Sequence, residues 1–126
     1  MQLLCVLNGG LLIQDCDNHA GCSHKITNGI DAFTITSLHH QMIYPFNLNP
    51  SNYDILYWSA TKRCSHYNGD KINPESITVE PEIAVFHREG FPVCLGVQGH
   101  PEMMHYGDLH DMLNDLILKY VNLQMA

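Results

Sequence analysis

The clearest pattern of apolar and polar positions lies near the carboxyl end of the chain. From Asp108 to Val121, apolar residues recur at intervals of three and four, the spacing that places them on one face of a helix. The pattern predicts an amphipathic helix over residues 108–121. A second helical segment is predicted for residues 2–7, which are apolar and stop at Asn8-Gly9-Gly10, where glycine can take a left-handed cap conformation.

Short apolar or alternating runs between these segments predict strands near residues 33–37, 54–59, 82–87 and 93–98. The last two runs are joined by only a few residues around Gly90-Phe91-Pro92, so they are expected to be neighbours. Residues 15–29 are polar and turn-rich, and they are predicted to form a loop. The order of helix end, strands and helix indicates an α/β or α+β layer.

Composition narrows this picture to one small domain. The chain has 126 residues, which fits a single domain, and its charged fraction of 15% is low enough to suggest a partly covered surface. Thirteen acidic residues oppose six scattered basic ones, for a net charge of −7, which disfavours a nucleic-acid partner. Five cysteines without the density of a disulfide scaffold favour a reducing cytoplasm. No signal peptide is expected at the start of the chain, and no apolar run reaches the roughly 18 residues of a membrane span.

The segment GVQGHPE, residues 96–102, is the part of the chain that says most about a possible catalytic function. Pro101 favours an extended conformation at His100, and residues i and i+2 of an extended chain project to the same side. Glu102 is therefore predicted to hydrogen-bond to His100, leaving the other ring nitrogen free to accept a proton from a nucleophile. The alternative is a turn whose histidine and glutamate simply face solvent.

Two other groups of residues are candidates for a metal site or a binding site. Cys16, His19, Cys22 and His24 fall within nine positions and are all zinc-type ligands, although a polar loop that happens to be rich in Cys and His is the alternative. His39-His40 follows a predicted strand. Adjacent strand residues point to opposite faces, so at most one of the two is expected to line a given site.

GVQGHPE resembles the GVQxHPE segment of class I glutamine amidotransferases, and most closely the gamma-glutamyl-gamma-aminobutyrate hydrolase-like branch. QLLCVLNGGLLIQD, residues 2–15, and SLHHQ, residues 37–41, are similar to further segments of that family. The resemblance implies that residues 1–126 form a partial domain: the carboxyl-terminal part of a three-layer, mostly parallel α/β sheet. The upstream half with the nucleophile is then expected to be missing.

The same resemblance implies a Cys-His-Glu triad that hydrolyses glutamine or a γ-glutamyl amide, with His100 and Glu102 as its catalytic residues here. The family nucleophile lies in a C-x-G-x-Q motif whose glutamine matches Gln2, so the cysteine is expected four residues before Gln2. Cys5 lies one turn after the motif and is expected to be a core residue. Gln2, His40 and Gln41 are the implied substrate-binding residues, and no metal or cofactor is expected.

The expected partners are a glutamine-like amide and either an amino-terminal half or a second copy of the chain, since an open sheet edge is rarely left uncovered. Without a nucleophile, this chain alone is expected to be inactive. Two alternatives belong to other classes: a non-catalytic binding or interaction module, and a small zinc-binding domain.

Overall fold

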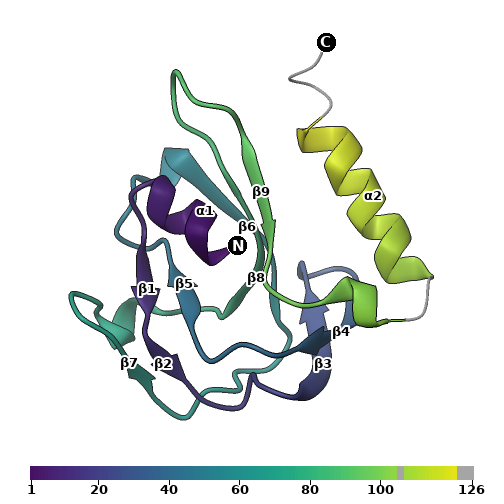
Figure 1. Ribbon diagram of the computed structural model, residues 1–126, viewed down its shortest axis with the longest axis horizontal. Coiled ribbons are helices and arrows are strands. Elements are labelled where there is room, and N and C mark those ends of the chain that lie inside the picture. Colours follow the sequence, from purple (N-terminus) through teal and green to yellow (C-terminus); the bar gives the residue numbers. More distant parts are fainter. Residues whose placement is uncertain (105–106, 122–126) are drawn as a thin grey trace.

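A computed structural model describes residues 1–104 and 107–121 of the chain. Figure 1 shows two α-helices and a set of short strands in this part, with three 3-10 turns between them. The elements are α1 (Gln2–Leu7), β1 (Leu11–Ile13), β2 (Asp15–Cys16), β3 (Cys22–Thr27), β4 (Ala32–Ser37), β5 (Met42–Tyr44), η1 (Pro50–Asn52), β6 (Tyr53–Ser59), β7 (Tyr67–Asn68), η2 (Pro74–Ser76), β8 (Pro81–Phe86), β9 (Cys94–Val97), η3 (Pro101–Met103) and α2 (Asp108–Tyr120).

The main sheet has five strands in the order β4-β3-β6-β8-β9, and every neighbouring pair in it is antiparallel. The pairs β1-β5 and β2-β7 are also antiparallel. The predicted fold, a mostly parallel three-layer sheet of the class I glutamine amidotransferase type, is therefore wrong. The connections explain why: residues 28–31 and 87–93 join sheet neighbours directly, whereas parallel neighbours need a crossover of a dozen or more residues.

The individual elements agree better with the sequence than their arrangement does. All four predicted strands and the helix predicted over 108–121 are confirmed within one residue at each boundary, and β8 and β9 are neighbours as expected. The short helix over residues 2–7 is also confirmed. The predicted loop over 15–29 is wrong, since β2 and β3 lie there.

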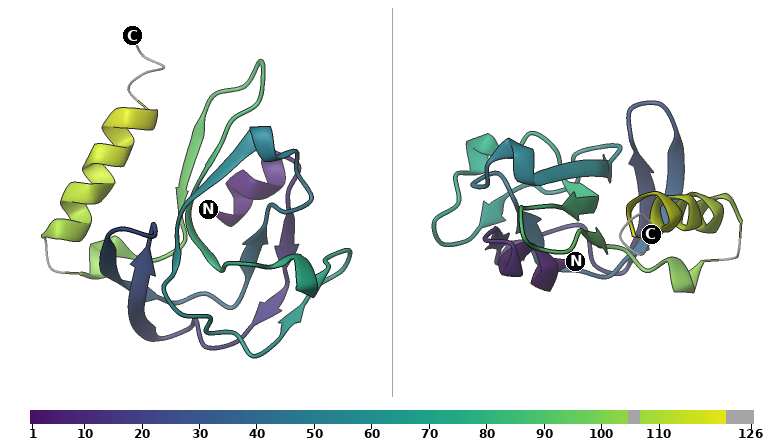
Figure 2. Two further views of the ribbon diagram at one scale, coloured as in Figure 1. Left: turned by 180° about the vertical axis from the view of Figure 1, so that it is seen from behind. Right: turned by 90° about the horizontal axis from the view of Figure 1, so that it is seen from above.

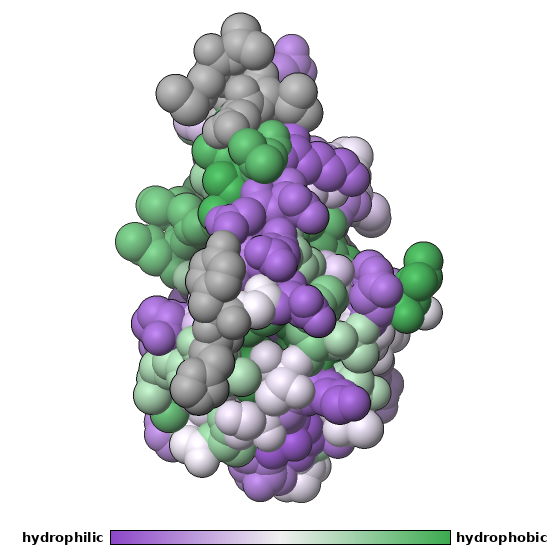
Figure 3. Space-filling model, turned by 90° about the vertical axis from the view of Figure 1, so that its right-hand side faces the viewer, coloured by the Kyte–Doolittle hydropathy of each residue, from purple (hydrophilic) through white to green (hydrophobic). Residues whose placement is uncertain are grey.

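The two helices pack on different parts of the sheet (Figure 2). Leu109 and Leu113 of α2 join Ile26, Ile35 and Ile83 in one buried cluster. Polar surface (purple) and patches of apolar surface (green) share the side of the molecule that carries α2 (Figure 3). Within the described residues, neither helix has the length and apolar character needed to cross a membrane.

Strand β8 is buried along its whole length. Ile83 belongs to the cluster beneath α2, whereas Ala84 and Phe86 pack with Cys5 and Ile43 on the side of α1. This alternation follows from the two-residue period of a strand, and it places β8 at the centre of the core.

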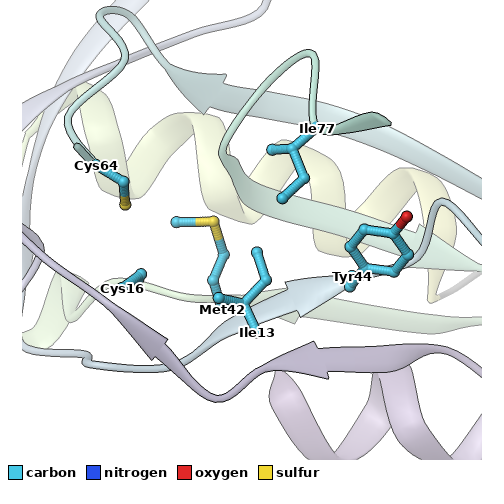
Figure 4. Packing of buried hydrophobic residues seen from close by; sticks show 6 residues of the cluster. All are labelled: Ile13, Cys16, Met42, Tyr44, Cys64 and Ile77. Carbon is cyan, nitrogen blue, oxygen red and sulfur yellow. The ribbon is translucent and has the colours of Figure 1, made fainter. Parts of the chain in front are cut away.

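A third cluster lies between β1, β5 and the segment that follows β6. Cys64 and Cys16 contribute to it, and Figure 4 shows the Cys64 sulfur pointing toward the side chain of Met42. All five cysteines of the chain are free thiols.

Candidate functional site

His100 and Glu102 lie directly after β9, where the chain turns into η3. The His100 amide donates to the carbonyl of Thr36, which ties the turn to the end of β4. The preceding glycine is required there, because a Cβ atom on Gly99 would lie 2.9 Å from the same carbonyl oxygen. The site is therefore anchored on two neighbouring segments of backbone.

The predicted pairing of these two side chains is confirmed. His100 Nδ1 lies 2.7 Å from Glu102 Oε1, and the side chains are 40% and 67% exposed. The hydrogen bond from His100 holds the pKa of Glu102 below its usual range. With Nδ1 engaged by a carboxylate, the tautomer that leaves a lone pair on Nε2 is favoured, which is the state a general base requires.

Two of the three predicted substrate-binding residues meet in the structure. Gln2 Nε2 donates to the Gln41 carbonyl across 3.2 Å, although 39 positions separate them in the sequence. His40 is exposed and His39 is buried, as expected for adjacent residues of an extended segment. Their proposed contact with substrate stays a prediction.

The amino end of α1 lies against β9. A Cβ atom built on Gly96 would come within 2.7 Å of the Met1 side chain, so the two segments are in close contact. This contact places the start of α1, which begins at Gln2, beside the strand that leads to His100.

The five thiols have environments or partners other than the pair. Cys5 is fully buried, and burial raises the pKa of its thiol to about 12. Cys94 Sγ points to the carbonyl of Pro92, and Cys64 Sγ to that of Asp17. Among the described residues, no hydrogen bond links a cysteine to His100.

A second group of polar side chains is buried in the core, and of its members only His19 and His24 were candidates from the sequence, whereas Glu80 and Glu82 were not. His19, His24, Glu80 and Glu82 are each less than 8% exposed. Glu80 accepts hydrogen bonds from the His19 ring at 2.6 Å, the Tyr67 hydroxyl at 2.8 Å and the backbone amides of Arg63 and Cys64. Burial alone would raise the pKa of Glu80, but these hydrogen bonds lower it to about 2.

Glu82 lies on the other side of His19. Its Oε1 is 3.5 Å from His19 Nδ1 and 3.2 Å from His24 Nε2. Burial opposes protonation of His19, but its hydrogen bonds with Cys64 and Glu80, together with the charge of Glu82, raise its pKa to about 9. The ring of His39 packs 4.6 Å from that of His19, and burial lowers its pKa to about 4.

A sequence signal for this cluster exists in Glu80-Pro81-Glu82. Two carboxylates two positions apart at the start of an apolar strand share one face of that strand, and that face is buried along β8. The zinc-type quartet considered from the sequence does not form. Cys16 packs in an apolar cluster and Cys22 Sγ points to the Asn18 carbonyl, so only His19 and His24 of the quartet converge.

Comparisons with protein-family models, curated proteins and solved structures found no match for this chain.

Proposed function

We propose that the His100–Glu102 pair is the acid–base part of an amide-hydrolysing site for glutamine or a γ-glutamyl amide, with the nucleophilic cysteine supplied from outside these 126 residues. The observation that carries the proposal is the 2.7 Å hydrogen bond between His100 Nδ1 and Glu102 Oε1. The likeness of GVQGHPE to the class I glutamine amidotransferases supports the choice of amide and nucleophile.

In the proposed reaction, Nε2 of His100 takes the proton from the cysteine thiol. The thiolate attacks the amide carbonyl carbon, and the imidazolium returns the proton to the departing nitrogen, so ammonia leaves from glutamine, or an amine from a substituted γ-glutamyl amide, and a thioester remains. Water, deprotonated by the same imidazole, then hydrolyses the thioester and restores the thiol. Glu102 keeps the ring oriented and stabilises the imidazolium in both steps.

An external nucleophile is proposed because, among the described residues, none of the five thiols hydrogen-bonds to His100. Cysteine attacks as the thiolate, and burial of Cys5 strongly disfavours that form. The contact between Met1 and Gly96 supports a cysteine placed ahead of Gln2, because a segment entering there meets the strand that carries His100. We also propose a cytoplasmic location, supported by the five free cysteines, because a reducing compartment keeps thiols unpaired.

The test measures the ammonia released from glutamine and the amine released from substituted γ-glutamyl amides. The chain is assayed alone and after a polypeptide with a Cys-x-Gly elbow is joined ahead of Met1, so that the cysteine lies four residues before Gln2. We expect release only from the joined protein, and we expect its loss when the elbow cysteine is replaced by Ser or His100 by Ala.

Hydroxylamine, which converts a thioester to a hydroxamate, reports the intermediate in the same samples. Two results contradict the proposal. One is a folded joined protein that forms neither ammonia nor hydroxamate. The other is ammonia release from the chain alone that a His100→Ala substitution abolishes, because the nucleophile would then be one of the five cysteines.

A further inference from the structure

Glu82 is a carboxylate buried without hydrogen-bonding partners. Its side chain is fully buried, and neither Oε1 nor Oε2 has a hydrogen-bond partner among the described residues. An ionised carboxylate taken out of water costs many kcal/mol unless a positive charge or several donors compensate. A bound cation compensates such a group directly.

The two histidines beside Glu82 turn unpartnered nitrogens toward it. Nδ1 of His24 faces the backbone carbonyl of Lys25 at 3.1 Å, a contact that requires a proton on Nδ1 and leaves a lone pair on Nε2. His19 Nε2 donates to Glu80, so the ring offers a lone pair on Nδ1 once Nδ1 has lost its proton, and a metal ion that binds there displaces that proton. Both His19 Nδ1 and His24 Nε2 are buried without a hydrogen bond.

We propose that His19 Nδ1, His24 Nε2 and a Glu82 carboxylate oxygen bind a zinc ion. The three ligand atoms lie within 4.8 Å of one another, and Glu82 Oε1 is 3.5 Å and 3.2 Å from the two nitrogens. Ligand atoms about 2.0–2.1 Å from a tetrahedral Zn²⁺ stand roughly 3.3 Å apart. The side chains are thus already close to the spacing that the ion requires.

Zinc fits this donor set better than calcium or magnesium. Imidazole nitrogens favour zinc, whereas the two harder ions take oxygen ligands almost alone. The bond from His19 Nε2 to Glu80 supplies the carboxylate support that histidine ligands of metals usually have. A water molecule completes the tetrahedron.

A second group, formed by His19, Cys64 and Glu80, also has its ligand atoms within 4.8 Å of one another. Its members are already satisfied. Glu80 accepts hydrogen bonds from four groups, and Cys64 Sγ lies 3.3 Å from the Asp17 carbonyl. The ligand atoms without hydrogen-bond partners belong to the group of His19, His24 and Glu82, so the zinc ion is assigned to that group.

The ion would join three segments that are distant in the sequence: the loop after β2, strand β3 and strand β8. A pocket lined in part by Ser59 and Glu80 lies on the Glu80 side of the cluster. This role is structural, and it does not depend on the chemistry proposed for His100 and Glu102.

The first test is calorimetric titration of chelator-treated protein with Zn²⁺. We expect one ion per chain, and we expect Glu82→Gln or His24→Gln to weaken the affinity at least about 100-fold, more than loss of an outer-shell partner does. Two controls should bind as the unaltered chain does: Glu75→Gln, the same change at an exposed position, and Cys64→Ser. Absence of saturable binding, or unchanged binding in Glu82→Gln, would overturn the proposal.

The second test uses Co²⁺ in the unaltered chain and so does not depend on how the variants fold. We expect visible absorption typical of four-coordinate cobalt with no sulfur-to-cobalt charge-transfer band. A sulfur band would overturn the assignment in favour of the Cys64 group, and an octahedral spectrum would overturn the proposed geometry. Zinc should also raise the thermal midpoint of the chain through mass action.

Discussion

Nε2 of His19 lies 2.6 Å from Oε1 of Glu80, although the two residues are 61 positions apart in the sequence. This bond is the centre of a polar network inside an otherwise apolar sheet protein. Buried networks of this kind are stable only when each member keeps its partners.

The first prediction tests the hydrogen bond from Tyr67 to Glu80. Tyr67→Phe removes a donor at 2.8 Å from a buried carboxylate and should lower the free energy of unfolding by about 1.5–3 kcal/mol. Chemical denaturation at neutral pH measures the change. Tyr53→Phe is the control, because the Tyr53 hydroxyl makes no hydrogen bond to the described residues, and a comparable loss in both variants would contradict the prediction.

The second prediction concerns the packing of α2. Leu113 is buried against the sheet, so Leu113→Ala should cost about 2–4 kcal/mol of unfolding free energy. Leu118 on the same helix is 59% exposed, and Leu118→Ala should change stability by less than about 0.5 kcal/mol. Equal losses at the two positions would mean that α2 does not dock through the Leu113 face.

The third prediction concerns the titration of Glu102. The hydrogen bond from His100 lowers the pKa of this carboxyl in the folded chain. The stabilisation from the pair is therefore fully present above the usual carboxyl range, and it is lost as the pH falls through the lowered value. Carbon-13 NMR of the side-chain carboxyl should show a low titration midpoint that His100→Gln shifts upward, and an unchanged midpoint in that variant would refute the pairing in solution.

The fourth prediction concerns thiol reactivity. Burial raises the pKa of Cys5 to about 12, and the residue is fully buried, so alkylation at pH 8 should be slow. Cys22 and Cys94 are partly exposed, so Cys22 should react faster than Cys5. Mass spectrometry after timed iodoacetamide treatment measures both sites, and Cys5 reacting as fast as Cys22 in folded protein would be the contrary result.

Local features were predictable from the sequence because they depend on neighbouring residues. The spacing of apolar positions located α2 and four strands, and the two-residue separation of His100 and Glu102 was enough to expect their bond. Strand β3 was missed because its inward positions include His24, which does not stand out as apolar.

Features that depend on chain direction and distant contacts were not predictable in this way. An apolar run such as β8 has the same composition in a parallel sheet as in an antiparallel one buried on both faces, so the resemblance led to the wrong sheet. The connection over residues 87–93 is too short for the crossover between parallel neighbours, and its length was the indication against a parallel sheet. The buried cluster joins His19 to Glu80 and Glu82, and no local pattern pairs residues so far apart.

The burial of β8 on both faces affects how the molecule unfolds. Ile83 packs in the cluster beneath α2, while Ala84 and Phe86 pack in the cluster on the side of α1. Neither cluster can open without exposing part of the same strand. The two sides should then unfold as one cooperative unit. Backbone amides of β8 should exchange with solvent only when the whole chain unfolds, and loosening α2 should speed exchange beside α1 as well.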